Sequence, residues 1–331
     1  MLRINWIRLV MLSALLVGCS RAVSEQGKPL VVNDGTQIMA TVVSEAPQYT
    51  IALVMKTLTN PFFVEMEKGA RQAEAELGIQ LVVKTGAQET SVEQQITIIR
   101  GLIAEHVDAI VVAPADSKAL LPALKEAQDA GIVIVNIDNQ LDLQGMQQIG
   151  LMGVPFISVD NELGAYLSAK YISDQVATPT QAIILEGIRT AKNAEDRKNG
   201  ALRAFRENPN IQVVAQETAH WKIDEAHDVV KGLLEQYPNV QVIFCANDMM
   251  AFGVIEYLDE VGRTDVLVAA YDALDEALEF LRNGKLQATI DQQAALQGYT
   301  GVQFALRMHQ GETVPAEVLV DVKLVTAKTL E

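Results

Sequence analysis

Five apolar, strand-like runs of this chain end in short planar polar side chains: Asp138-Asn139, Asp160-Asn161, Asn247-Asp248, Asp272 and Asp291-Gln292. Carboxylate and amide groups offer two polar atoms in one plane, which suits them to bridge neighbouring hydroxyls of a ligand. Hydrogen bonds with a charged partner contribute about 1.5–3 kcal/mol each. An Asp or Asn after a strand also caps the next helix in many proteins, so capping is the alternative role for each of them. The recurrence favours a shared ligand-binding edge, with Asp160 and Asp248 also candidates for caps or hinge contacts.

A pair of aromatic residues follows the first predicted strand, in the run Asn60-Pro61-Phe62-Phe63. Asn60 can cap a helix, and Pro61 loses no helical hydrogen bond at the first position. The two rings therefore lie in the first turn, beside the carboxyl end of a strand, where open parallel sheets bind their ligands. Aromatic faces can pack against the C–H faces of a sugar ring. The pair together with the polar strand ends suits a neutral polyhydroxylated ligand; a purely structural role in the core is the alternative.

The pattern from residue 50 onward alternates apolar strands with longer amphipathic helices. The predicted strands are 50–55, 79–84, 108–113 and 132–137, then 181–186, 211–216, 241–246, 266–270 and 287–290. The predicted helices are 61–77, 90–105 and 117–130, then 161–176, 193–207, 224–236, 248–261 and 273–282. A helix over 293–310 and a strand pair within 317–325 complete the chain. Near-continuous Val/Ile/Leu strands between helices indicate an α/β fold of two doubly wound parallel-sheet domains.

The first residues are typical of export. Arg3 and Arg8 precede a short apolar run, which predicts a secretory signal peptide over residues 1–18 and is too short for a permanent membrane span. Leu16-Val17-Gly18-Cys19 resembles the lipobox of bacterial lipoproteins, in which Cys19 becomes the acylated N-terminus. Residues 19–48 then form a lipidated N-terminus with a flexible tether. The alternative is an ordinary secretory signal with an incidental cysteine.

Composition excludes several classes of protein. The formal charge of −16 and the lack of a basic stripe argue against nucleic acid as a partner. Cys19 and Cys245 are the two cysteines, so lipidation of Cys19 leaves no intrachain disulfide, and Cys245 is expected in the core. No nucleophile elbow, phosphate-cradling glycine loop or metal-ligand spacing of histidines occurs. We therefore expect no enzyme, no cofactor and no metal site.

Residues 50 to 325 resemble the periplasmic ribose-type sugar-binding proteins, which have the type 1 periplasmic binding protein fold and serve as substrate receptors of ABC sugar importers. The matching motifs are residues 59–63, 113–117, 159–161, 246–248 and 284–290. The resemblance implies two lobes, residues 49–158 plus 293–320 and residues 159–292 plus 321–331. Three hinge crossings near 158–160, 290–293 and 320–322 would let the lobes close on a ligand in the cleft.

The resemblance also implies ligand-binding residues. Those expected here are Lys56, Asn60, Phe62, Phe63, Asp138, Asn139, Asn161, Glu195, Trp221, Asn247, Asp272 and Gln292. Trp221 would face the Phe pair across the sugar ring, and a buried core tryptophan is the alternative.

This sequence departs from the ribose-binding pattern. Asn139 and Glu195 stand where that pattern has arginines, Lys56 replaces a small hydroxyl residue, and Ala113 replaces an asparagine. Loss of two arginine donors would change which hydroxyl stereochemistry is accepted, so ribose itself is in question. Glu195 and Lys56 could pair across the cleft, or Glu195 could bind a cationic ligand such as an amino sugar.

The predicted function is that of a substrate-binding lipoprotein of an ABC-type importer, with a monosaccharide or polyol as ligand. The alternative is a receptor for a sugar or a furanose-like signal that feeds a chemotaxis or kinase sensor. The expected partners are the transporter membrane subunits and, through the lipid, a membrane surface. The protein is expected to be an extracytoplasmic monomer anchored to the cell envelope.

Overall fold

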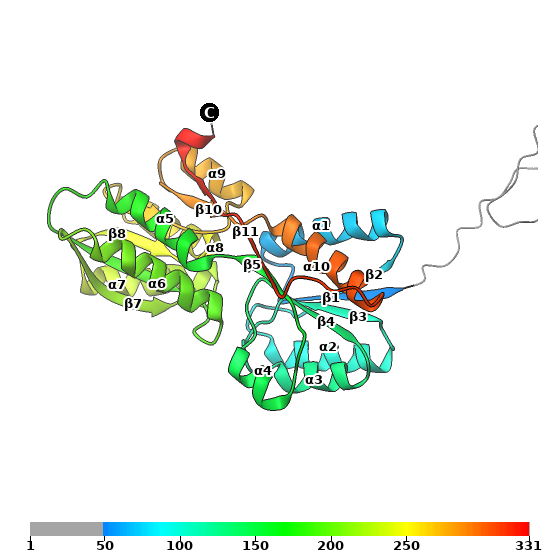
Figure 1. The fold of residues 1–331 in the computed structure, drawn as a ribbon. Coiled ribbons are helices and arrows are strands. Elements are labelled where there is room, and N and C mark those ends of the chain that lie inside the picture. Colours follow the sequence, from blue (N-terminus) through cyan, green and yellow to red (C-terminus); the bar gives the residue numbers. More distant parts are fainter. Residues whose placement is uncertain (1–48, 331) are drawn as a thin grey trace, which may run out of the picture. The chain divides into compact units, whose positions relative to one another are not determined.

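The computed structural model describes residues 49–330. The predicted signal peptide, Cys19 and the tether lie outside the described residues. The described chain forms two lobes, each built on a parallel sheet with helices on both faces, so the predicted α/β fold class is confirmed (Figure 1).

The first lobe contains a six-stranded sheet in the order β11-β5-β4-β3-β1-β2, with all neighbouring strands parallel. Its strands are β1 (Thr50–Met55), β2 (Gln80–Thr85), β3 (Ala109–Val112), β4 (Val133–Ile137), β5 (Phe156–Val159) and β11 (Glu317–Val320). Its helices are α1 (Pro61–Leu77), α2 (Val92–Ala104), α3 (Leu121–Asp129), α4 (Leu143–Ile149) and α10 (Ala294–His309). Helix α4 is absent from the sequence-based expectations; Asp142 begins it by accepting a hydrogen bond from Gly145 N at 2.7 Å.

Side-chain alternation along β1 divides the core of this lobe into two layers. Ile51 and Leu53 pack into the cluster that also contains residues of α1 and α10, whereas Ala52 and Val54 pack into the cluster with α2 and α3. Successive strand residues point to opposite faces, so an uninterrupted apolar strand needs helices on both sides. Figure 1 shows α1 and α10 on one side of the sheet and α2 and α3 on the other.

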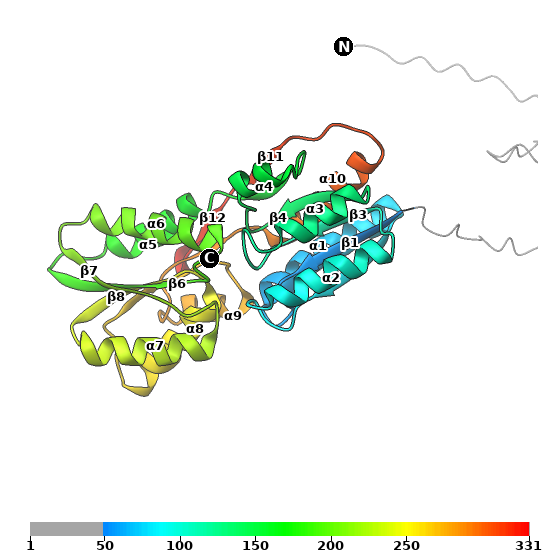
Figure 2. The same cartoon turned by 90° about the horizontal axis from the view of Figure 1, so that it is seen from below.

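The second lobe contains a four-stranded parallel sheet in the order β7-β6-β8-β9. Its strands are β6 (Thr180–Glu186), β7 (Ile211–Thr218), β8 (Val240–Cys245) and β9 (Leu267–Ala269). Its helices are α5 (Asn161–Ser173), α6 (Lys192–Arg206), α7 (Ile223–Gln236), α8 (Asp248–Glu260) and α9 (Asp275–Arg282). Helices α5 and α6 cover one face and α7 and α8 the other (Figure 2). Cys245 is fully buried in this core, as expected.

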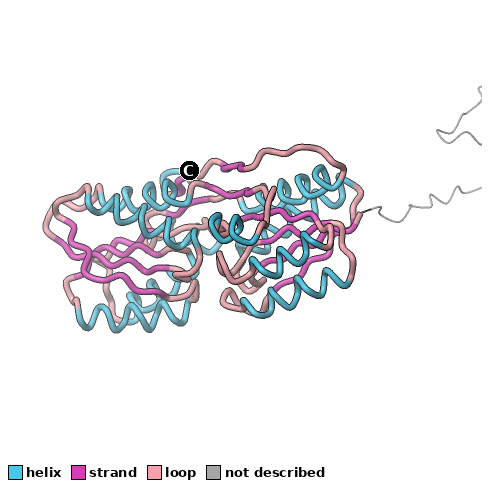
Figure 3. Tube along the Cα trace, turned by 60° about the horizontal axis from the view of Figure 1, so that its bottom comes forward, coloured by secondary structure: helices cyan, strands magenta, loops and turns pink. Residues whose placement is uncertain are grey.

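The chain passes between the two lobes after β5, after β10 (Thr289–Asp291) and after β11. Both strands predicted within 317–325 are present. Strand β11 pairs in parallel with β5 of the first lobe, whereas β12 (Lys323–Val325) pairs antiparallel with β10. Because Asp321 and Val322 carry the chain from one sheet to the other, β11 and β12 cannot pair with each other. Figure 3 shows strands and helices alternating along the trace of both lobes. A 3-10 turn, Ala327–Thr329, follows β12.

Within residues 49–330, no helix combines the length and the apolar character that a membrane crossing requires.

Candidate ligand-binding site

A small cavity lies between the lobes at the carboxyl ends of strands from both sheets. Its free volume in this structure is about 20 Å³. The residues that line it are Lys56, Asn60, Phe62, Phe63, Glu89, Asp138, Asn193, Arg197, Trp221, Asn247, Asp272 and Gln292. Lys56 follows β1, Asp138 follows β4 and Asn247 follows β8. The structure therefore brings residues that follow strands of both sheets together around one cavity.

An ion pair belongs to the first lobe. Lys56 Nζ lies 2.8 Å from Asp138 Oδ2, and both side chains are about 97% buried, with 3% exposed. Asp138 has a left-handed backbone with φ of 62°, and its main chain is held on both sides, since its N–H donates to Ile157 O and its carbonyl accepts from Ser158 Oγ. These bonds fix the carboxylate at the cavity.

Asn60 has two roles. Its Oδ1 accepts from Phe62 N at 3.0 Å, which is the predicted helix cap, and its Nδ2 donates to Glu89 Oε1 at 2.8 Å. Burial raises the pKa of Glu89, with Lys56 and the Asn60 bond acting in the opposite direction. Burial thus disfavours the charged form of this carboxyl relative to a free glutamate.

Arg197 of α6 organises the second-lobe side of the cavity. It donates to Asn161 Oδ1 at 2.8 Å, to Ala246 O at 2.9 Å and to Gln292 Oε1 at 3.2 Å. Its guanidinium also lies 3.5 Å from Asp272 Oδ1. Burial raises the pKa of Asp272, opposed by Arg197. The guanidinium carbon lies 3.7 Å from the centre of the Tyr271 ring, so the group is stacked as well as hydrogen-bonded.

Aromatic rings come from both lobes. Phe62 and Phe63 pack edge to face with centroids 5.0 Å apart. Trp221 is 96% buried and has a left-handed backbone with φ of 68°. A Cβ on Gly187 would lie 2.0 Å from the Trp221 ring, so only glycine admits the indole there. Trp221 belongs to the second-lobe core, which was the alternative interpretation, and its side chain also lines the cavity.

Three buried polar atoms on cavity-lining side chains have no hydrogen-bond partner among the described residues, and one of them, Asp138 Oδ2, lies 2.8 Å from Lys56 Nζ. The other two are Asn193 Oδ1, an acceptor, and Trp221 Nε1, a donor. Buried polar groups are nearly always hydrogen-bonded in proteins, so such atoms beside a cavity call for an explanation.

Three of the expected ligand-binding residues do not line the cavity. Asn161 accepts a hydrogen bond from Arg197 and so holds that side chain in position without lining the cavity itself. Asn139 is fully buried and contacts Ser117 and α6. Glu195 lies on the exposed side of α6, where it pairs with Lys198. The expected pair between Glu195 and Lys56 is wrong, because Lys56 pairs with Asp138 within its own lobe.

Three residues that line the cavity were not predicted from the sequence: Glu89, Asn193 and Arg197. Asn193 and Arg197 are four residues apart, which places them on one face of α6. The inferred loss of an arginine at position 195 is thus offset by Arg197 half a turn later. A check of both helix faces for polar pairs at this spacing could have found them.

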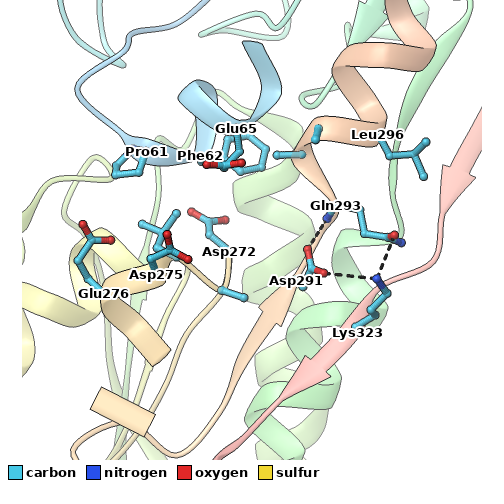
Figure 4. A pocket seen from close by; sticks show the side chains of 14 residues that line it. Pro61, Phe62, Glu65, Asp272, Asp275, Glu276, Asp291, Gln293, Leu296 and Lys323 are labelled. Atoms are coloured by element: carbon cyan, nitrogen blue, oxygen red, sulfur yellow. Dashed lines mark hydrogen bonds and ion pairs between the residues drawn. The ribbon is translucent and has the colours of Figure 1, made fainter. Parts of the chain in front are cut away.

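A second pocket lies along the crossing segments and shares Phe62 and Asp272 with the cavity (Figure 4). Asp291 accepts from Gln293 N at 2.7 Å and lies 3.6 Å from Lys323 Nζ. These contacts fix the turn into α10, where Gln293 has a φ of 53°. In the described part of the chain, no group of His, Cys, Asp and Glu is arranged to hold a metal ion.

Two α/β lobes that enclose a small polar cavity define the class of two-lobed solute receptors. Residues 51–313 match the family model described as "Periplasmic binding protein domain". The chain therefore belongs to the periplasmic binding protein family, which confirms the resemblance to ribose-type receptors and makes it a solute receptor, not an enzyme.

Named relatives are similar over most of their length. The chain is 38% identical over 299 residues to the D-ribose/D-allose-binding protein of Pseudomonas aeruginosa, covering 87% of this chain and 92% of that one. It is 31% identical over 291 residues to the D-allose-binding periplasmic protein of Escherichia coli, covering 87% and 93%. An ABC transporter periplasmic solute binding protein from Actinobacillus succinogenes, solved with bound D-allose, has a TM-score of 0.80 at 37% identity and covers 85% of this chain and 98% of that chain.

We predict that Arg197→Ala lowers the free energy of unfolding by about 3–5 kcal/mol, because it leaves Asp272 buried without its cation. Arg203→Ala is the matched control on the same helix. Arg203 pairs with Glu162 at a site where both side chains are more than 40% exposed, and its loss should change stability by about 1 kcal/mol or less. Urea denaturation of both variants measures the difference; equal losses would contradict the role assigned to Arg197.

Proposed function

We propose that this protein is the substrate receptor of an ABC-type importer and that it binds a neutral monosaccharide of the ribose–allose class between its lobes. The observation that carries the proposal is the pair of unpartnered buried atoms, Asn193 Oδ1 and Trp221 Nε1, on side chains that line the cavity. A hydroxyl group both donates and accepts, so adjacent hydroxyls of one sugar can satisfy both atoms.

The charges in the cavity favour a neutral ligand. Lys56 is paired with Asp138, and Arg197 with Asp272. The remaining carboxyl, Glu89, has its pKa raised by burial and is hydrogen-bonded to Asn60. Both buried cations already lie beside a carboxyl of their own lobe, so neither is free to neutralise an anionic ligand, and an unpaired buried charge is strongly unfavourable.

The lining of the cavity suits a sugar ring. The aromatic rings Phe62 and Trp221 supply apolar faces, and the amides and acids supply hydrogen bonds.

The names of the relatives narrow the class of sugar that we propose as ligand. The relative from Pseudomonas aeruginosa is named for D-ribose and D-allose, and the solved structure from Actinobacillus succinogenes contains D-allose. These two sugars share their configuration at C2, C3 and C4. We infer that this shared face is what the cavity recognises, and that D-glucose, which differs from D-allose at C3, fits less well.

Closure of the lobes would couple binding to transport. A ligand that contacts both lobes stabilises the closed form, and the membrane subunits of the importer would then recognise that form.

We propose that one lobe consists of residues 49–158 plus 293–320 and the other of residues 159–292 plus 321–331. Side-chain packing supports the first boundary, since Ile157 lies in a first-lobe core cluster and Val159 in that of the second lobe.

Periplasmic binding proteins of ABC importers are extracytoplasmic. We further propose that Cys19 carries a lipid that anchors this protein to a membrane surface, on the strength of the lipobox-like residues 16–19. We also propose that it acts as a monomer, because one chain supplies every residue that lines the cavity.

We predict that D-allose and D-ribose raise the melting temperature of the protein more than D-glucose does. A ligand at about 100 times its Kd stabilises the folded state by about 2.7 kcal/mol, which corresponds to roughly 5–10 °C for a chain of this size. Asn193→Ala should weaken binding of both sugars about two- to tenfold, since it removes the unpartnered acceptor. Asn199→Ala, an amide on the same helix outside the cavity, is the control. No shift with either sugar, or equal shifts with all three, would rule out the proposed class.

We predict that Cys19→Ser moves the protein from the membrane fraction to the soluble fraction of the cell envelope, because the acylated residue is lost. Fractionation with immunodetection measures this. A conservative change elsewhere in the tether, Ser24→Ala, is the control. Membrane retention of Cys19→Ser would show that Cys19 is not the anchor.

A further inference from the structure

Helix α6, which carries Asn193 and Arg197 to the cavity, begins without a cap of its own. Its N-cap residue is Ala191, which has the extended backbone that caps adopt, with φ of −97° and ψ of 127°, but no side-chain acceptor. The first N–H groups of a helix have no partner within the helix, and alanine is among the poorest N-cap residues.

The first lobe supplies the missing cap across the cleft. Lys192 N donates to Ser117 Oγ at 3.1 Å, and Asn193 N donates to Asn139 Oδ1 at 3.2 Å. A third bond between the lobes runs from Ser117 N to Thr190 O at 3.2 Å. Ser117 and Asn139 are 6% and 0% exposed, so the bonds are shielded from water.

The capping side chains are held in position within the first lobe. Asn139 Nδ2 donates to Pro114 O at 3.1 Å and to Ser117 Oγ at 3.3 Å. These bonds use the amide NH₂ group. Oδ1 also accepts from Ser117 Oγ at 3.4 Å, and its second lone pair remains for α6. The amide is therefore oriented before the lobes meet, which reduces the entropy lost when the contact forms.

We propose that Ser117 and Asn139 are positioning residues for ligand capture, which form a latch by capping α6 from the opposite lobe. This rests on the proposed function, since it explains how that site closes. When the lobes separate, the N–H groups of α6 and the two capping side chains return to water, so the bonds stabilise the closed form alone. The latch also places Asn193 and Arg197 over the cavity. Asn139 thus acts on binding without lining the cavity.

The test compares affinities for D-allose and D-ribose by titration calorimetry. Asn139→Ala and Ser117→Ala should each weaken binding about three- to tenfold, by the same factor for both sugars, and should speed dissociation. The uniform factor is the diagnostic result, because a residue that touches the ligand would change the ratio of the two affinities.

Two further variants distinguish an effect on the latch from an effect on the stability of the whole protein. Asp142 caps α4 within the first lobe, so Asp142→Ala should lower the melting temperature and leave both affinities unchanged. Ala191→Ser offers α6 a cap from its own lobe and changes nothing in the first lobe. It should raise the melting temperature of the sugar-free protein and weaken binding about two- to fivefold, because the open form no longer leaves α6 uncapped.

Wild-type affinity in Asn139→Ala and Ser117→Ala, a changed affinity ratio, or unchanged or tighter binding in Ala191→Ser would each overturn the latch. Failure of the wild-type protein to bind either sugar would instead overturn the proposed function.

Discussion

Four buried charges have to be neutralised in one small cavity, and the rest of the site is arranged around them. Taking a charge out of water is unfavourable by several kcal/mol unless a partner lies close and the remaining polar atoms are hydrogen-bonded. The protein pairs Lys56 with Asp138 in the first lobe and Arg197 with Asp272 in the second. Because each ion pair lies within one lobe, each buried cation has its carboxyl partner before the lobes meet. What remains for the ligand is to supply hydroxyls.

The sequence predicted the parts of the site that depend on sheet geometry. Asp138 and Asn247 follow strands of the two parallel sheets, and the carboxyl ends of parallel strands converge at one edge of each sheet. Asn60 was predicted to cap α1, and it does so while it lines the cavity. These residues could be found because the strand that positions each one is visible as an apolar run.

The parts that depend on contact between elements could not be predicted in this way. Helix α6 is rich in charge along its whole length, so its polarity does not show which face meets the cavity. The family resemblance placed Glu195 at an arginine position, and the charge of the helix gave no independent reason to choose Arg197 instead. Glu89 lies in a loop, and only tertiary packing brings it to Asn60.

Asn139 lies at a strand end but does not line the cavity. It follows Asp138 directly, yet the left-handed backbone at Asp138 turns the chain so that only Asp138 reaches the cavity. The neighbouring amide serves the closed arrangement of the lobes instead. One strand end therefore supplies both a ligand-facing carboxylate and a contact that closes the site.

A crystal structure of the protein grown with D-allose tests the central claim most directly. The account predicts one sugar in the cavity, with its ring between Phe62 and Trp221 and with hydroxyls within about 3.2 Å of Asn193 Oδ1 and Trp221 Nε1. A sugar bound elsewhere, or a closed cavity that excludes it while both atoms stay unpartnered, would contradict the account.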